Sequence, residues 1–152
     1  MRVMWFCVLF VLMSLLICTV MAAVIEGSGN KSMENMPAVF PKDRIIAAKD
    51  FYDKWQEIQN GKNNAVLLDV RTPREYESGH ISRSKNVSSD HPSLVLEHWP
   101  DRNMEILVYC RTHHRAMGVA SFLYRHGYQN IYVLENGILS WAKNGYPLNK
   151  LN

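Results

Sequence analysis

The chain has 152 residues, of which 47% are hydrophobic, and its formal net charge at pH 7 is +3. This length suits one domain with an extension and excludes two domains of ordinary size. The 17 lysines and arginines are scattered along the chain. They form no basic stripe, so we expect no nucleic-acid partner.

The chain begins with an apolar segment. Arg2 is followed by an apolar run that ends at Met21-Ala22-Ala23, a small-residue pattern typical of signal-peptidase cleavage. We predict that residues 1–23 are a signal peptide and that the domain is exported, to the periplasm or outside the cell. The alternative is an uncleaved anchor, because residues 3–25 are long enough to span a bilayer. Only in that case would the membrane be a partner, with the domain held outside the cytoplasm.

The rest of the chain divides into a linker and one domain. Residues 24–41 are polar and carry Gly, Ser, Asn and Pro, which is typical of a linker. Within residues 42–150, candidate strands lie at 44–46, 65–70, 84–87, 105–110 and 130–134. Candidate helices lie at 47–61, 72–78, 91–99, 116–127 and 137–145. This alternation predicts an α/β fold with a central, mainly parallel sheet flanked by helices.

One thiol stands alone in the predicted domain. Of the three cysteines, Cys7 and Cys18 lie in the targeting segment, which leaves Cys110. Small exported domains usually pair their cysteines, so a solitary thiol is a candidate reactive group. The alternative is a buried, inert cysteine. Without a second cysteine, a disulfide mechanism of the Cys-x-x-Cys kind is excluded.

The surroundings of Cys110 favour chemistry. It ends the apolar run 105–110, and ligands of parallel sheets bind outside the carboxyl ends of the strands. We expect a five-residue loop and then a helix, so that loop N–H groups, the helix N-terminus, Arg111 and Arg115 create a positive cradle. Such a cradle stabilises a thiolate, the nucleophilic form of cysteine, and would also hold an anionic substrate.

Three stretches, in order along the chain, resemble the rhodanese-type sulfurtransferases. The first has Asp69-Val70-Arg71, Glu75-Tyr76 and Gly79-His80-Ile81; the second is the loop that begins at Cys110; the third has Gly137, Trp141 and Gly145-Tyr146-Pro147. The resemblance implies a rhodanese-like three-layer fold. It also implies that Cys110 takes sulfane sulfur from thiosulfate or a related anion as a persulfide and passes it to a thiol or cyanide. No metal and no organic cofactor is implied.

The loop itself supplies the candidate substrate-binding residues. They are Arg111, Thr112, His113, His114, Arg115 and Ala116. The Cys-x4-Arg spacing resembles the sulfurtransferases, whereas phosphatases of the same fold resemble Cys-x5-Arg. His113 stands where the family often has glycine, so a positive φ there would be strained. Cys-x-x-His-His could also bind zinc or copper, but we favour histidines that line the mouth of the pocket.

Further residues have either a supporting or a purely structural interpretation. Asp69 stands at the end of the predicted strand in 65–70, and Arg71 follows it. The two either support the loop or form an internal ion pair, and we favour the structural interpretation. His80, Trp55, Trp99 and Trp141 are interpreted as packing residues. An alternative function is a non-catalytic persulfide carrier or docking module, and a less favoured one is a cysteine-dependent phosphatase or arsenate reductase.

Overall fold

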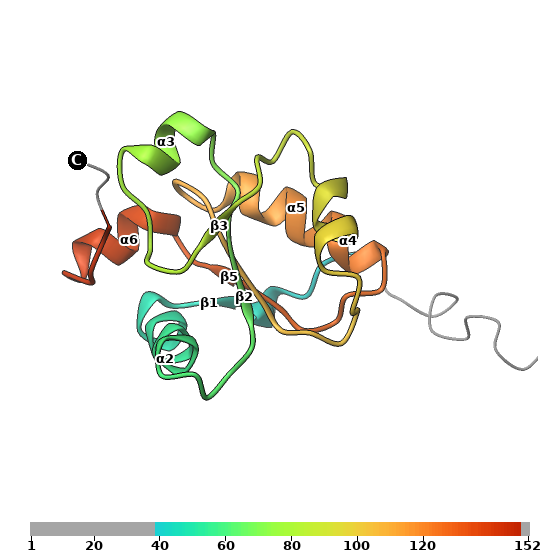
Figure 1. Ribbon diagram of the computed structural model, residues 1–152, viewed down its shortest axis with the longest axis horizontal. Coiled ribbons are helices and arrows are strands. Elements are labelled where there is room, and N and C mark those ends of the chain that lie inside the picture. Colours follow the sequence, from blue (N-terminus) through green and yellow to red (C-terminus); the bar gives the residue numbers. More distant parts are fainter. Residues whose placement is uncertain (1–38, 150–152) are drawn as a thin grey trace, which may run out of the picture. The chain divides into compact units, whose positions relative to one another are not determined.

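The computed structural model describes residues 39–149, which form a five-stranded sheet with helices around it (Figure 1). The predicted signal peptide or anchor at 1–23, and nearly all of the predicted linker at 24–41, lie outside these residues. Within residues 39–149, no helix is both long and apolar enough to cross a membrane.

The sheet is parallel throughout, as the sequence predicts. The strands are β1 (Ile45–Ile46), β2 (Val66–Asp69), β3 (Lys85–Asn86), β4 (Ile106–Tyr109) and β5 (Ile131–Leu134). They pair in the order β1-β5-β4-β2-β3, and every pair is parallel. The chain runs outward from β2 to β3 and then returns to β4 on the other side of β2. Ligands of such sheets bind at the carboxyl ends of the strands beside this reversal.

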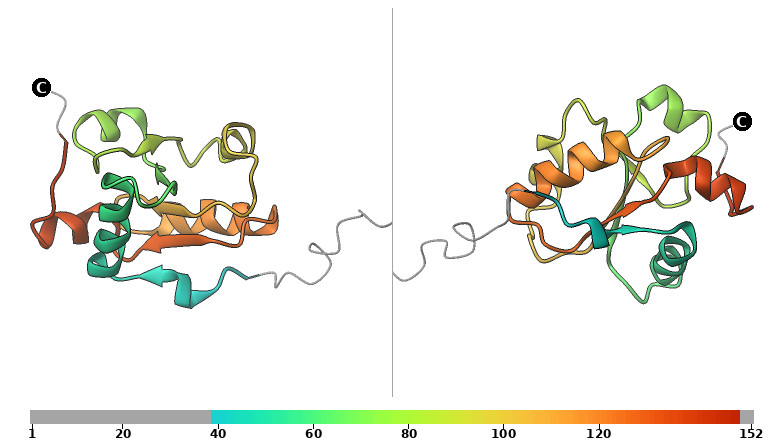
Figure 2. Two further views of the ribbon diagram at one scale, coloured as in Figure 1. Left: turned by 60° about the horizontal axis from the view of Figure 1, so that its bottom comes forward. Right: turned by 180° about the vertical axis from the view of Figure 1, so that it is seen from behind.

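Helices cover both faces of the sheet (Figure 2). They are α2 (Ala48–Gln59), α3 (Pro73–Glu77), α4 (Ser93–His98), α5 (His114–Arg125) and α6 (Gly137–Lys143), preceded by a 3₁₀ turn, η1 (Lys42–Arg44). Side chains of α4 and α5 join one hydrophobic cluster, and side chains of α2 and α6 join the other. Successive residues of β4 alternate between the two clusters, which is why the strand is apolar throughout.

Two boundaries differ from the sequence-based expectation. Helix α5 begins at His114, not at residue 116, so the expected five-residue loop is only Arg111–His113. Apolar periodicity starts at Ala116, but the first turn of a helix can be polar, and the Met117 N–H already bonds to the His113 carbonyl at 2.8 Å. Upstream, Phe40 is 3% exposed and packs edge-on against Tyr124, so core packing starts inside the segment interpreted as linker.

Candidate active site

Cys110 directly follows β4 and is 1% exposed. It belongs to the hydrophobic cluster on the α5 side of the sheet, together with Val108, Val70 and Ala116. The thiol is unpaired, and it lies where the strand turns into the loop before α5. Any reactant must therefore reach the thiol in an enclosed site, not at an exposed surface.

The backbone around Cys110 is rich in unused donors. Within residues 39–149, the N–H groups from Arg111 to Ala116 donate no hydrogen bond to a protein acceptor. The N-cap residue of α5, His113, provides no side-chain cap. The helix has 12 residues, and its N-terminal end adds a partial positive charge at the same place. This run of free N–H groups is the kind of backbone arrangement that binds small anions.

The two loop arginines play different roles. Arg111 is exposed and, among the described residues, has no carboxylate partner. Arg115 instead forms a two-pronged ion pair with Glu75 of α3, with N–O distances of 2.7 and 2.8 Å. The charge of Arg115 is therefore largely compensated, contrary to the expectation that both arginines face a substrate. Glu75 joins the loop to α3, a role that the sequence does not reveal.

The ion pair changes the titration of Glu75. Hydrogen bonds from Arg115, against a smaller opposing effect of burial, lower the pKa of Glu75 from 4.5 to about 2. The side chain also closes a capping box with Thr72. Because the folded-state pKa is lowered, the stabilisation is complete above about pH 4.5. It disappears as the pH falls toward 2.

We expect Glu75→Gln to lower the free energy of unfolding by about 1 kcal/mol at pH 7, because the half-exposed pair loses its charge while glutamine keeps the capping box. The difference from the wild type should shrink as the pH falls below 4. Urea unfolding at several pH values measures it. Glu77→Gln, on the exposed side of the same helix, is the control. Equal losses in both variants, or a loss that does not depend on pH, would contradict this role.

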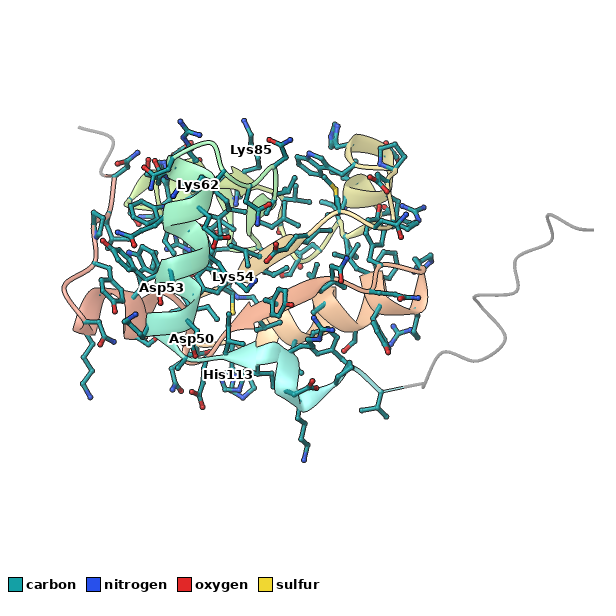
Figure 3. All side chains as sticks on the ribbon, turned by 90° about the horizontal axis from the view of Figure 1, so that it is seen from below. Asp50, Asp53, Lys54, Lys62, Lys85 and His113 are labelled. Atoms are coloured by element: carbon teal, nitrogen blue, oxygen red, sulfur yellow. The ribbon has the colours of Figure 1, made fainter. Side chains whose placement is uncertain are left out.

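His113 adopts a backbone conformation that favours glycine. Its φ is 153°, so the structure gives this position of the loop a positive φ. Its ring Nδ1 donates to the Thr112 carbonyl at 2.8 Å and the ring stacks on His114, with 4.3 Å between the ring centroids. Figure 3 shows His113 at the edge of the molecule. The strained backbone therefore places two stacked imidazoles beside the loop.

We expect His113→Gly to be more stable than His113→Ala by about 1 kcal/mol, because only glycine relieves the strain at this φ. Both variants remove the same ring and the same stacking contact with His114. In a helix or strand, a glycine variant is normally less stable than the alanine variant by about 0.5–1 kcal/mol. A more stable glycine variant would therefore indicate backbone strain at residue 113. Thermal unfolding of the pair measures it. A more stable alanine variant would show that the backbone is not strained here.

The geometry does not favour the Cys-x-x-His-His metal interpretation. The two rings stack on each other, and one ring nitrogen of His113 is already hydrogen-bonded to Thr112. Cys110 is buried in the core cluster. In the part of the chain that the structure describes, no three His, Cys, Asp or Glu side chains are grouped so as to hold a metal ion.

Helix α6 holds the loop from the other side. The N–H of Ile138 donates to the Cys110 carbonyl at 2.8 Å, and that of Leu139 lies 3.3 Å from the Arg111 carbonyl. Gly137 allows this close approach, since a Cβ there would lie 2.5 Å from the Cys110 oxygen. Asn136 and Gly137 both have positive φ, 56° and 57°. The sequence identifies this stretch only by resemblance, and its contact with the loop emerges from the fold.

Asp69 and Arg71 form a buried ion pair, which supports the structural interpretation. Arg71 donates to both Asp69 oxygens, at 2.9, 3.0 and 2.6 Å, and to the Gly79 carbonyl at 2.7 Å. Burial opposes the charge of Arg71, but hydrogen bonds and the charge of Asp69 raise its pKa overall. The Asn86 amide bonds to both of their backbone carbonyls. This network joins the end of β2 to Asn86 of β3 and to Gly79.

The other residues singled out from the sequence lie as follows in the structure. Thr112 is exposed, and its hydroxyl lies 3.3 Å from a ring nitrogen of His114. The side chain of Ala116 is 0% exposed, so its contribution to a ligand would come through its N–H. His80 is buried and stacks on Tyr76, which confirms a packing role. The predicted packing tryptophans, Trp55, Trp99 and Trp141, are buried or half-buried.

The fold and the loop have known counterparts. Residues 52–144 match the rhodanese-like domain family. The chain belongs to this family. The rhodanese-like domain is 27% identical over 85 residues to a sulfurtransferase from Allochromatium vinosum, covering 56% of this chain and 78% of the relative. It is also 28% identical over 116 residues to a tRNA uridine(34) hydroxylase from Onion yellows phytoplasma, covering 72% of this chain and only 36% of that enzyme.

Solved structures of other proteins have a similar fold. The crystal structure of a rhodanese-related protein from Thermoplasma volcanium is 32% identical, with a TM-score of 0.58, and the match covers 72% of this chain and 99% of that one. A thiosulfate sulfurtransferase from Pseudomonas aeruginosa is 27% identical, with a TM-score of 0.59, covering 70% of this chain and 20% of that one. The predicted three-layer rhodanese-like fold is therefore confirmed.

Proposed function

We propose that this rhodanese-like domain is a sulfurtransferase that moves sulfane sulfur from thiosulfate, or a related anion, to a thiol or cyanide through a persulfide on Cys110. The observation that carries the proposal is the run of N–H groups from Arg111 to Ala116, which have no protein acceptor within residues 39–149, next to the Cys110 thiol. Arg111 adds a full positive charge without a carboxylate partner among the described residues. The site thus combines a nucleophile with an anion cradle.

The reaction has two half-reactions. The Cys110 thiolate attacks the outer sulfur of thiosulfate. A new S–S bond forms, the old S–S bond breaks, and its electron pair leaves with sulfite. The acceptor thiolate, or cyanide, then attacks the outer sulfur of the persulfide, and Cys110 leaves as a thiolate. Charge and electrons balance in each half without an oxidant or cofactor, which is covalent catalysis with ping-pong kinetics.

The loop geometry supports the transfer of a single atom. Helix α5 begins at His114, so only Arg111–His113 separate the nucleophile from the helix. Arg115, the arginine of the Cys-x4-Arg spacing, is held by Glu75. These features favour transfer of one sulfur atom over the recognition of a whole phosphate or arsenate group.

Intact mass of protein expressed from the full chain tests the proposal. Thiosulfate should add one sulfur atom, about 32 Da, to the wild type, and cyanide should remove it as thiocyanate over many cycles. Cys110→Ser is the control, because it keeps the shape of the side chain and should gain no mass and show no turnover. A mass gain without turnover would indicate a persulfide carrier. Hydrolysis of p-nitrophenyl phosphate without any mass gain would favour a phosphatase.

We also propose that the domain works outside the cytoplasm, on the basis of residues 1–23. The mass of the protein recovered from its native host distinguishes a cleaved signal peptide from an uncleaved membrane anchor. Loss of the first 22 or 23 residues would support a cleaved signal peptide, and the full-length mass in a membrane fraction would support an anchor. Full-length protein in the cytoplasm would overturn the export proposal.

A further inference from the structure

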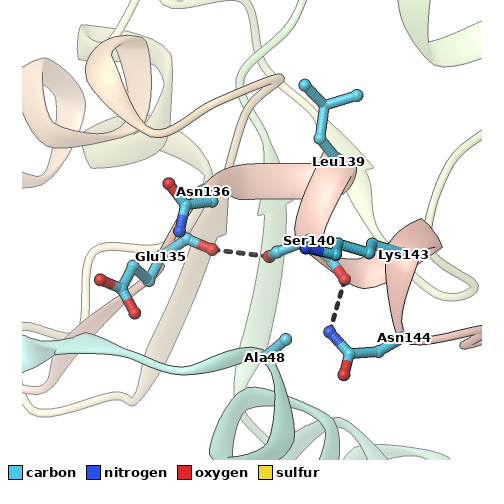
Figure 4. A pocket seen from close by; sticks show the side chains of 7 residues that line it. All are labelled: Ala48, Glu135, Asn136, Leu139, Ser140, Lys143 and Asn144. Carbon is cyan, nitrogen blue, oxygen red and sulfur yellow. Dashed lines mark hydrogen bonds between the residues drawn. The ribbon is translucent and has the colours of Figure 1, made fainter.

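A cavity lies on the outside of α6. It has a volume of about 550 Å³ and opens between the first turn of α2 and the segment from the end of β5 through α6 (Figure 4). Its lining includes Ala48, Glu135, Asn136, Leu139, Ser140 and Lys143. The volume falls within the range of small-molecule sites, about 300–1,000 Å³.

The cavity carries opposite charges on opposite sides. Glu135 stands on the side of the β5–α6 turn, and Lys143 stands on the side of α6 (Figure 4). Among residues 39–149, neither side chain takes part in an ion pair. A carboxylate and an ammonium group are therefore both available to a ligand, and they suit one that itself carries both charges.

The wall between these charges is held in place by hydrogen bonds. The Ser140 hydroxyl lies 2.6 Å from the Glu135 carbonyl and 2.8 Å from that of Gly137. The amide of Asn144 donates to the Ser140 carbonyl at 2.8 Å. Because these polar groups already form hydrogen bonds with the backbone, this side of the cavity is ordered before a ligand binds. Glu135 and Lys143 are then the groups available to recognise the ligand.

The cavity adjoins the Cys110 loop through Leu139. This residue lines the cavity, and its N–H lies 3.3 Å from the Arg111 carbonyl. Its neighbour Ile138 donates to the Cys110 carbonyl itself. The Leu139 side chain is 49% exposed, so it offers an apolar surface between the cavity and the loop.

We propose that this cavity binds the sulfur acceptor, and that the acceptor is a small thiol with an amino-acid head group. Its ammonium group pairs with Glu135 and its carboxylate with Lys143, while the thiol passes Leu139 toward the loop. The inference rests on the proposed sulfurtransferase function and specifies its second half-reaction. The acceptor thiolate attacks the outer persulfide sulfur and leaves as a persulfide, while the Cys110 thiolate is restored.

The charge arrangement selects against simpler thiols. A thiol with only a carboxylate leaves Glu135 unpaired and is repelled by it, and a thiol with only an amine is repelled by Lys143. A neutral thiol gains nothing from either charge. Cyanide has no head group and bypasses the cavity, so turnover with cyanide provides an internal reference.

The test compares acceptors at saturating thiosulfate. We expect kcat/KM per thiolate to be at least ten-fold higher for L-cysteine than for cysteamine, 3-mercaptopropionate or 2-mercaptoethanol. Lys143→Met should lower the ratio of kcat/KM for L-cysteine to kcat/KM for cyanide at least ten-fold. The same variant should raise kcat/KM for cysteamine relative to L-cysteine. Glu135→Gln should favour 3-mercaptopropionate. S-methyl-L-cysteine, which cannot accept sulfur, should inhibit the wild type competitively with L-cysteine and inhibit Lys143→Met far less.

Lys62→Met is the matched control, because Lys62 follows the opposite end of α2 (Figure 3), and it should leave the acceptor ratio unchanged. If thiocyanate forms but the order of thiols is the same in the wild type and both cavity variants, the acceptor site is wrong and the proposed function stands. If the enzyme forms no thiocyanate from cyanide at all, the proposed function fails and the acceptor site fails with it.

Discussion

Gly137→Ala should destabilise the protein by about 3 kcal/mol and reduce sulfur transfer at least a hundred-fold. The new Cβ would lie 2.5 Å from the Cys110 carbonyl oxygen and 2.6 Å from two backbone atoms of Arg111. Gly137 also has a φ of +57°, which alanine rarely adopts. The overlap is with backbone, so relief requires α6 or the loop to move. Movement of the loop displaces the nucleophile, and movement of α6 removes the hydrogen bonds from Ile138 and Leu139 that hold the loop.

Gly145→Ala is the matched control for this prediction. Gly145 has a φ of +73°, but a Cβ there meets nothing within 4 Å. It should therefore cost only about 1 kcal/mol, the backbone strain alone, and leave the turnover with thiosulfate and cyanide intact. Urea unfolding and the thiocyanate assay measure both effects. Equal effects of the two substitutions would show that contact of α6 with the loop is unimportant.

The second large effect concerns the buried ion pair. Arg71→Met should lower the free energy of unfolding by about 3–5 kcal/mol, because it leaves the carboxylate of Asp69 buried without a partner. The side chains of Arg71 and Asp69 are 6% and 0% exposed. The loss should be visible in urea unfolding followed by the fluorescence of the buried Trp55 and Trp141.

A double-mutant cycle separates charge from packing. The variant with both Asp69→Asn and Arg71→Met should lose less stability than the two single variants added together, because no uncompensated charge is left. The exposed pair Lys49–Asp53 is the control, with side chains 71% and 51% exposed, and Lys49→Met should cost less than about 0.5 kcal/mol. Additive single losses at Asp69 and Arg71 would show that the two charges do not stabilise each other.

Most of the fold can be predicted from local patterns. Apolar runs mark β2 and β4 because both faces of those strands are buried, and the capping box of Thr72 and Glu75 marks the start of α3. Local patterns place the start of α5 two residues late. Its first turn is polar, and the apolar periodicity begins only where the helix meets the core.

The site is predictable in part. The position of Cys110 at the end of a strand follows from the sequence. The sequence marks His113 as a residue where the family often has glycine, but its positive φ comes from the structure. The pairing of Arg115 with Glu75 does not follow, because the two residues are 40 positions apart and come together only when α3 packs beside the loop. The same holds for the contact of α6 with the carbonyls of Cys110 and Arg111.

By itself, the sequence determined the parallel α/β architecture, the single cysteine of the predicted domain at a strand end and the short spacing between Cys110 and Arg115. These properties depend on periodicity, residue type and chain spacing, which are local. Only the tertiary structure decided that Glu75 compensates Arg115 while Arg111 has no carboxylate partner among residues 39–149, and that Glu135 and Lys143 share a cavity. Those outcomes depend on which distant side chains the packed layers bring within a few ångströms of each other.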